Sequence, residues 1–62
     1  DVVILSSDFY AHSMLGVNLP CSGRYKTYLG ERYYFWETTS KNWELGDLPP
    51  EFSDTRYWYV EL

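Results

Sequence analysis

The chain of 62 residues is long enough for one small domain, and a chain of this size buries only about 60% of the surface that its unfolded form exposes. This excludes a large self-contained enzyme core. Five Lys and Arg against nine Asp and Glu give a formal charge of −4, so the chain repels a nucleic-acid backbone and nucleic acid is not expected as a partner.

The sequence pattern also argues against a membrane span and a metal or cofactor site. No run approaches the roughly 18–20 apolar residues of a membrane-spanning helix, so no membrane partner is expected. The single cysteine, Cys21, excludes an internal disulfide and lacks the neighbouring Cys or His that a structural zinc site needs. No glycine-rich phosphate loop is present, so no cofactor is expected. The sequence does not indicate a cellular compartment.

The first two segments have the patterns of β-strands. Residues 1–6 read DVVILS, a short β-branched and apolar run with the length of a buried strand. Residues 11–17 read AHSMLGV and alternate imperfectly, so that His12, Met14 and Gly16 share one face of an extended chain. We therefore predict two strands here.

The strongest hairpin signal lies between residues 24 and 38. Two aromatic, β-prone runs, 24–29 and 31–38, flank Gly30. In the second run, large apolar side chains fall on both faces, so we expect this strand to be covered on both sides.

The remainder of the sequence predicts a long irregular loop followed by a last strand. Across residues 39–54, the pair Pro49 and Pro50 cannot donate the hydrogen bonds of a central strand, and one turn of helix is the most regular structure expected. Residues 56–62, RYWYVEL, have the composition of a strand. The fold class is therefore all-β and mainly antiparallel. We expect about five short strands, with a central hairpin and a long irregular loop, in a small sheet or partial barrel.

We interpret residues 1–62 as a single small β domain and as a fragment of a longer protein, because the sequence begins at Asp1 rather than at Met. A chain of this size without a disulfide has a small margin of stability. Edge strands such as 56–62 can pair between copies. We therefore also expect a homo-oligomer or contact with the rest of the parent chain.

His12 is the only histidine in the chain. A lone imidazole acts as a general base, as a metal ligand or simply as a hydrogen-bonded, half-buried side chain. Glu37 follows 25 positions later at the end of another predicted strand, and the intervening hairpin can lay the two strands side by side. A carboxylate beside an imidazole fixes its tautomer and stabilises the imidazolium, which prepares a base to activate a thiol or hydroxyl. His12 and Glu37 are therefore the candidate catalytic residues.

These residues carry a resemblance to a known superfamily. A strand with the histidine in AHSMLGV, then a hairpin, then YYFWETT with an acid at the strand end and NWELGDLPPE, resembles the second half of the transglutaminase-like cysteine protease superfamily. The resemblance spans most of residues 10–50. It implies a Cys-His-acid triad with His12 as base and Glu37, in place of the usual Asp, as orienting acid. It also implies a cysteine hydrolase or acyl-transferase with a protein or peptide substrate.

The nucleophile departs from the family pattern. In the superfamily, the cysteine precedes the histidine at the start of a helix, whereas Cys21 follows His12 in a Pro-Cys-Ser-Gly loop. The resemblance therefore implies that the nucleophile lies upstream of Asp1 and that this piece is inactive alone.

A function from another class stays open: a non-catalytic, aromatic-rich β module that binds a protein or carbohydrate partner. Aromatic residues make up 21% of the sequence, and rings on an exposed sheet face stack on sugars or prolines at small entropic cost. The candidate binding residues are Trp36, Trp43 and Trp58. The competing interpretation is that such rings belong to the core.

Overall fold

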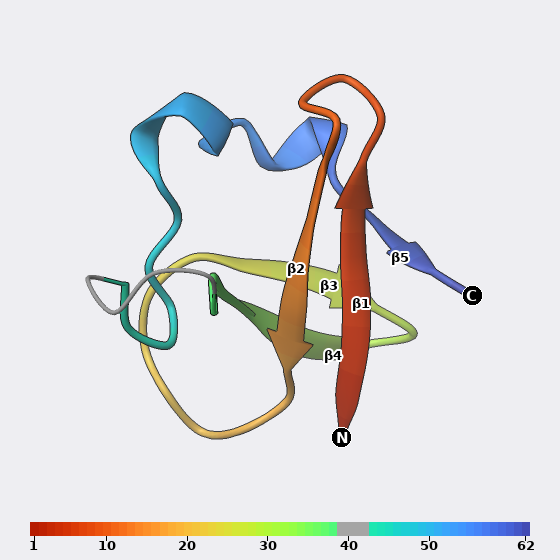
Figure 1. The fold of residues 1–62 in the computed structure, drawn as a ribbon. Helices are drawn as coiled ribbons and strands as arrows, with labels where there is room; N and C mark the ends of the chain where they lie inside the picture. The colour runs from red at the N-terminus through yellow and green to blue at the C-terminus, as the bar shows by residue number, and fades with distance from the viewer. Residues whose placement is uncertain (39–42) are drawn as a thin grey trace.

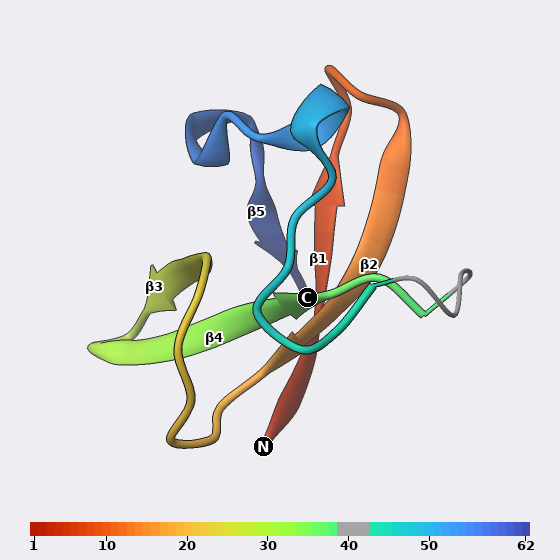
Figure 2. The same ribbon diagram turned by 90° about the vertical axis from the view of Figure 1, so that its left-hand side faces the viewer.

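The computed structural model describes residues 1–38 and 43–62. Within these residues, five strands form one antiparallel sheet in the order β3-β4-β2-β1-β5, and the sheet curls into a half-barrel (Figures 1 and 2). The strands are β1 (Val2–Ser7), β2 (His12–Val17), β3 (Tyr25–Tyr28), β4 (Glu31–Trp36) and β5 (Tyr59–Glu61). The predicted all-β fold with about five short strands and a hairpin is confirmed.

The sheet has two faces that differ in composition and covering. The inner face carries Leu5, Met14 and Phe35, which are buried. The outer face carries Ile4 and Leu15, which are register partners across β1 and β2, and Trp36, which is the partner of Leu15 across β2 and β4. This division follows from the alternation of side chains along each strand.

Gly16 of β2 allows close packing on the inner face. A Cβ atom at this position would lie 2.8 Å from the Cδ1 atom of Leu5. Any larger residue would displace the Leu5 side chain, which is fully buried in the core. Glycine at this point of the strand is therefore explained by packing rather than by a turn.

The β3–β4 hairpin turns through two residues, Leu29 and Gly30, whose φ angles are 52° and 82°. Two consecutive positive φ angles characterise the tight turn whose twist matches that of the flanking strands. Beyond the turn, β4 lies between β3 and β2. Most of its apolar side chains are buried, in line with the expected covering on both sides, but Trp36 is 38% exposed.

The segment 43–58, called here the covering segment, packs against the inner face (Figure 2). It begins by docking on β4, where the Gly46 amide donates to the carbonyl of Phe35 at 2.7 Å and the Gly46 carbonyl accepts from the amide of Arg24 at 2.8 Å. Leu48 and Trp58 then complete the core cluster with Leu5, Met14 and Phe35. The hydrophobic core therefore lies between the sheet and the covering segment.

Two short 3₁₀ helices give the covering segment its shape: η1 (Pro50–Phe52) and η2 (Thr55–Tyr57). Proline occupies the first turn of η1, where its missing N–H is not needed. Asp54 caps η2 by accepting from the backbone N–H of Arg56 at 3.1 Å. One turn of helix was expected and two are present among the described residues. The second, η2, includes residues 56 and 57 of the predicted strand 56–62. The last strand is correspondingly shorter than predicted.

Candidate functional site

The antiparallel pairing of β2 with β4 places His12 and Glu37 next to each other. His12 is the first residue of β2 and Glu37 directly follows β4, and the two strands run in opposite directions with Gly16 paired to Phe35. The start of β2 therefore lies beside the end of β4. The His12 Nε2 atom and the Glu37 carboxylate are in hydrogen-bonding contact. Two residues that are 25 positions apart in the chain thus form one polar pair on the inner side of the sheet.

The two members of the pair differ in their access to solvent. The side chain of Glu37 is 5% exposed, whereas that of His12 is 28% exposed. An ionised carboxylate can only accept hydrogen bonds, so the Nε2–H group donates and the neutral ring keeps its lone pair on Nδ1. A buried carboxylate needs such a partner because its desolvation is costly. The arrangement can therefore accept a proton at Nδ1 while Glu37 stabilises the resulting imidazolium.

Aromatic rings of the covering segment surround the His12 ring. The Phe52 ring is stacked on the imidazole, with centroids 4.6 Å apart and an interplanar angle of 14°. The Trp58 ring meets the imidazole edge-on at 6.3 Å. Sequence reasoning did not identify Phe52. Its only sequence signal is the preceding Pro49-Pro50 pair, which marks a rigid turn but not what that turn contacts.

Neither Cys21 nor Ser7 is placed to act as the nucleophile beside His12. Cys21 lies in the loop between β2 and β3, which follows the end of β2 opposite to His12, and the strand alone separates its ends by roughly 17 Å. Ser7 is the register partner of His12, but it is 2% exposed, and its Oγ accepts from the amide of Tyr10 at 3.1 Å. A complete triad is therefore not assembled from these residues.

The three candidate tryptophans occupy three different environments. Trp58 is 1% exposed and belongs to the core, so its ring does not offer the exposed surface that the binding interpretation expects. The ring lies inside because Trp58 links η2 to β5 and points back toward Phe35, with centroids 5.4 Å apart. Trp43 is partly buried in irregular chain. Trp36 is the most accessible of the three, on the outer face beside Leu15.

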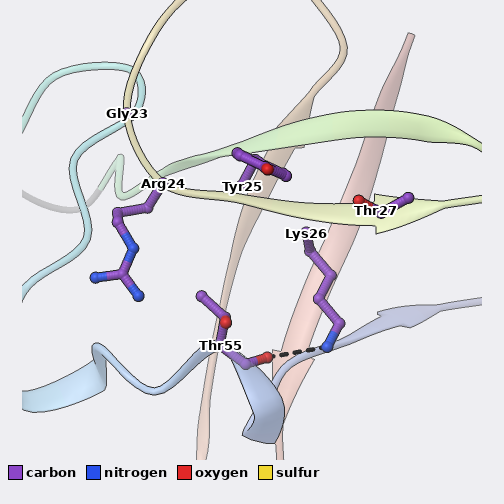
Figure 3. Close-up of a pocket in the computed structure, with 6 residues that line it drawn as sticks. All are labelled: Gly23, Arg24, Tyr25, Lys26, Thr27 and Thr55. Carbon is purple, nitrogen blue, oxygen red and sulfur yellow. Dashed lines mark hydrogen bonds between the residues drawn. The ribbon is translucent and has the colours of Figure 1, made fainter.

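Figure 3 shows a hollow between β3 and the covering segment, and His12 does not belong to its lining. Its lining includes two cations, but both are engaged with the covering segment. The Lys26 Nζ atom donates to the carbonyl of Thr55 at 3.0 Å, and the Arg24 Nη2 atom donates to the carbonyl of Ser53 at 2.5 Å. The two side chains therefore join the β3 edge to the covering segment.

The described residues contain neither a metal-binding cluster nor a membrane-spanning helix. Among residues 1–38 and 43–62, no three His, Cys, Asp or Glu side chains come together as a metal site requires. No helix in this part of the chain is long and apolar enough to cross a membrane.

Comparison of the chain with protein-family models, with curated proteins and with solved structures finds no match. A functional interpretation is therefore based on the geometry of the His12–Glu37 pair and on the motifs AHSMLGV and YYFWETT.

Proposed function

We propose that His12 and Glu37 are the base and the orienting acid of a Cys-His-Glu triad in a transglutaminase-like cysteine hydrolase or acyl-transferase. The observation that supports this proposal is the contact between His12 Nε2 and the Glu37 carboxylate. The resemblance of AHSMLGV and YYFWETT to the superfamily implies such a contact between a histidine and an orienting acid. The thiol comes from a segment outside these 62 residues.

The proposed chemistry is acyl transfer from an amide. His12 Nδ1 accepts the proton of the thiol, and the thiolate attacks the carbonyl carbon of a protein or peptide substrate. Glu37 stabilises the imidazolium, which then gives its proton to the leaving amine. Water, or an amine in the transferase variant, then attacks the thioester carbonyl while His12 accepts its proton. The carbon–sulfur bond breaks, and the leaving thiolate recovers the proton from His12. Each step thus uses one proton that moves between Nδ1 and a reacting group.

The difference in exposure between the two side chains supports these roles. The proton-transferring ring must be reachable from outside, and the His12 side chain is 28% exposed. The orienting acid must hold one position without contacting substrate, and Glu37 is buried. A pair with both members buried would lack access, and a pair with both exposed would be weakly held.

The test uses the chain extended by the sequence that its gene encodes before Asp1. We expect a cysteine in that extension to be alkylated rapidly by iodoacetamide near neutral pH, because the adjacent imidazole promotes the thiolate. The variants His12→Ala and Glu37→Gln should slow this labelling, while Cys21→Ser should leave it unchanged. An extension without cysteine, or a labelling rate that ignores both variants, would contradict the proposal.

A second candidate function is supported by the outer face. Ile4, Leu15 and Trp36 lie side by side across β1, β2 and β4, and Ile4 and Trp36 are exposed. Such a row fits a non-catalytic module that binds a protein or carbohydrate through a flat apolar surface. Titration with glycans and proline-rich peptides, read by tryptophan fluorescence, should then give a change that Trp36→Ala abolishes. A spectrum that no ligand alters would exclude this function.

A further inference from the structure

We infer that Phe52 is a positioning residue that sets the plane of the His12 imidazole, so that Glu37 and the Nδ1 lone pair act in a defined direction. This inference rests on the proposed function for its catalytic meaning. The observation behind it is the parallel stack of the two rings, 4.6 Å between centroids and 14° between planes. The contact of Phe52 with the pair is this stack on the His12 ring, so the effect that we infer is exerted through the imidazole.

Phe52 and Glu37 constrain different degrees of freedom of the same ring. An imidazole rotates about its Cβ–Cγ bond over broad energy wells, and a stacked neighbour holds the ring parallel to itself. The stack alone would accept the ring turned by 180°. The hydrogen bond to Glu37 selects the orientation with Nε2 toward the carboxylate. Together, the two contacts leave Nδ1 with one direction, which is what a general base needs.

The position of Phe52 is itself fixed by contacts with its neighbours. The Trp58 Nε1–H group donates to the Phe52 carbonyl at 2.9 Å. The Phe52 amide donates to the carbonyl of Pro49 at 2.9 Å, which closes the turn of η1. The Tyr10 ring meets the Phe52 ring edge-on at 5.5 Å. Because Trp58 is fully buried, the stacked ring is anchored to the core rather than to a loose loop.

Phe9 offers a matched control for Phe52. Phe9 is stacked on Tyr57 at 4.1 Å with an interplanar angle of 12°, in the same aromatic cluster, and makes no ring contact with His12 among the described residues. Phe52→Leu and Phe9→Leu therefore each remove one stacked phenyl ring and keep an apolar side chain. Phe52→Tyr keeps the ring and serves as the conservative rescue.

The experiment is nitrogen NMR of the His12 imidazole in the 62-residue chain, at a pH where the ring is neutral. We expect one dominant tautomer with the proton on Nε2 in the wild type, in Phe9→Leu and in Phe52→Tyr. In Phe52→Leu we expect the two nitrogen shifts to move toward each other, because the ring no longer stays aligned with Glu37. Dispersed amide spectra and thermal unfolding confirm that each variant is folded.

The outcomes separate the inference from the proposed function. Shifts in Phe52→Leu that equal those of the wild type would overturn the positioning role, as would equal changes in Phe9→Leu. Shifts that remain averaged in Phe52→Tyr would also overturn it, because the ring itself would then not be the cause. None of these results depends on a thiol. The iodoacetamide experiment can therefore fail while the effect of Phe52 on the ring stands, and the reverse is equally possible.

Discussion

On the inner face of the sheet, Leu5 and Phe35 are completely buried, whereas Ile4 and Trp36 on the outer face remain exposed. The strands are the same, and the difference comes from the covering segment, residues 43–58, which packs on the inner face. The polar pair of His12 and Glu37 lies on this covered side. Electrostatic interactions are stronger in such a place than on an open surface. The comparison thus relates the covered face of the sheet to the proposed chemistry.

The largest expected effect comes from replacing the tryptophan of each face by alanine. Trp58→Ala removes a fully buried ring and should destabilise the protein by about 3–5 kcal/mol. In a chain this small, such a loss leaves little folded protein. Trp36→Ala, on the outer face, should cost about 1 kcal/mol or less because much of the ring already contacts water. Urea unfolding followed by far-ultraviolet circular dichroism measures both.

A comparable loss of stability for the two tryptophan variants would mean that the outer face is as closely packed as the inner one. The distinction between the faces would then fail. A Trp58→Ala variant that stays stable would also contradict the argument that Trp58 anchors Phe52 to the core through its hydrogen bond.

The second comparison concerns one carboxylate on each face. Glu37→Ala removes the buried partner of His12 and should lower the free energy of unfolding by about 1–3 kcal/mol. Glu61 accepts from the Ser6 hydroxyl at 2.6 Å but is exposed, so Glu61→Ala should cost less than about 0.5 kcal/mol. Urea unfolding of both variants checks the prediction. Equal losses would indicate that the His12–Glu37 contact is as well hydrated as the surface one.

The part of the site formed by strands was predictable, and the part formed by the covering segment was not. Alternation within AHSMLGV placed His12 on the same face as Met14, and the hairpin brought the ends of two strands together. Phe52 and the burial of Trp58 depend instead on tertiary contacts of an irregular segment without hydrophobic periodicity. Alternation in RYWYVEL could not reveal that Trp58 precedes the strand and turns inward. The catalytic role of His12 and Glu37 stays a prediction.

A third change acts at a turn that belongs to neither face. Leu29 has a φ angle of 52° and is exposed, and a residue with a Cβ in this conformation costs roughly 1 kcal/mol. Leu29→Gly should therefore raise the free energy of unfolding by up to about 1 kcal/mol. The NMR signals of the His12 ring should not change. If stability falls, or if the ring signals move, the hairpin and the site are more strongly coupled than the two faces suggest.

The smallest expected effect is a pH dependence within the covering segment. The Arg56 guanidinium and backbone N–H donate to the Asp54 carboxylate and lower its pKa from 3.8 to about 2. A pKa that is lower in the folded state than in the unfolded one stabilises the fold above pH 3.8, and this contribution disappears as the pH falls toward 2. Asp54→Asn keeps a capping oxygen but removes the charge. Because the Arg56 side chain is 83% exposed, the difference should be small and screened by salt.

Thermal unfolding of the wild type and Asp54→Asn between neutral pH and about pH 2 measures this difference. The wild type should be slightly more stable at neutral pH, and the two curves should converge on acidification. A gap that stays constant down to pH 2 would show that the cap on η2 does not involve the charged form of Asp54. Equal His12 ring signals in the wild type and in Asp54→Asn at each pH would place this charge pair outside the site. The inner face would then depend on the apolar packing of the covering segment and not on the charges at the surface of that segment.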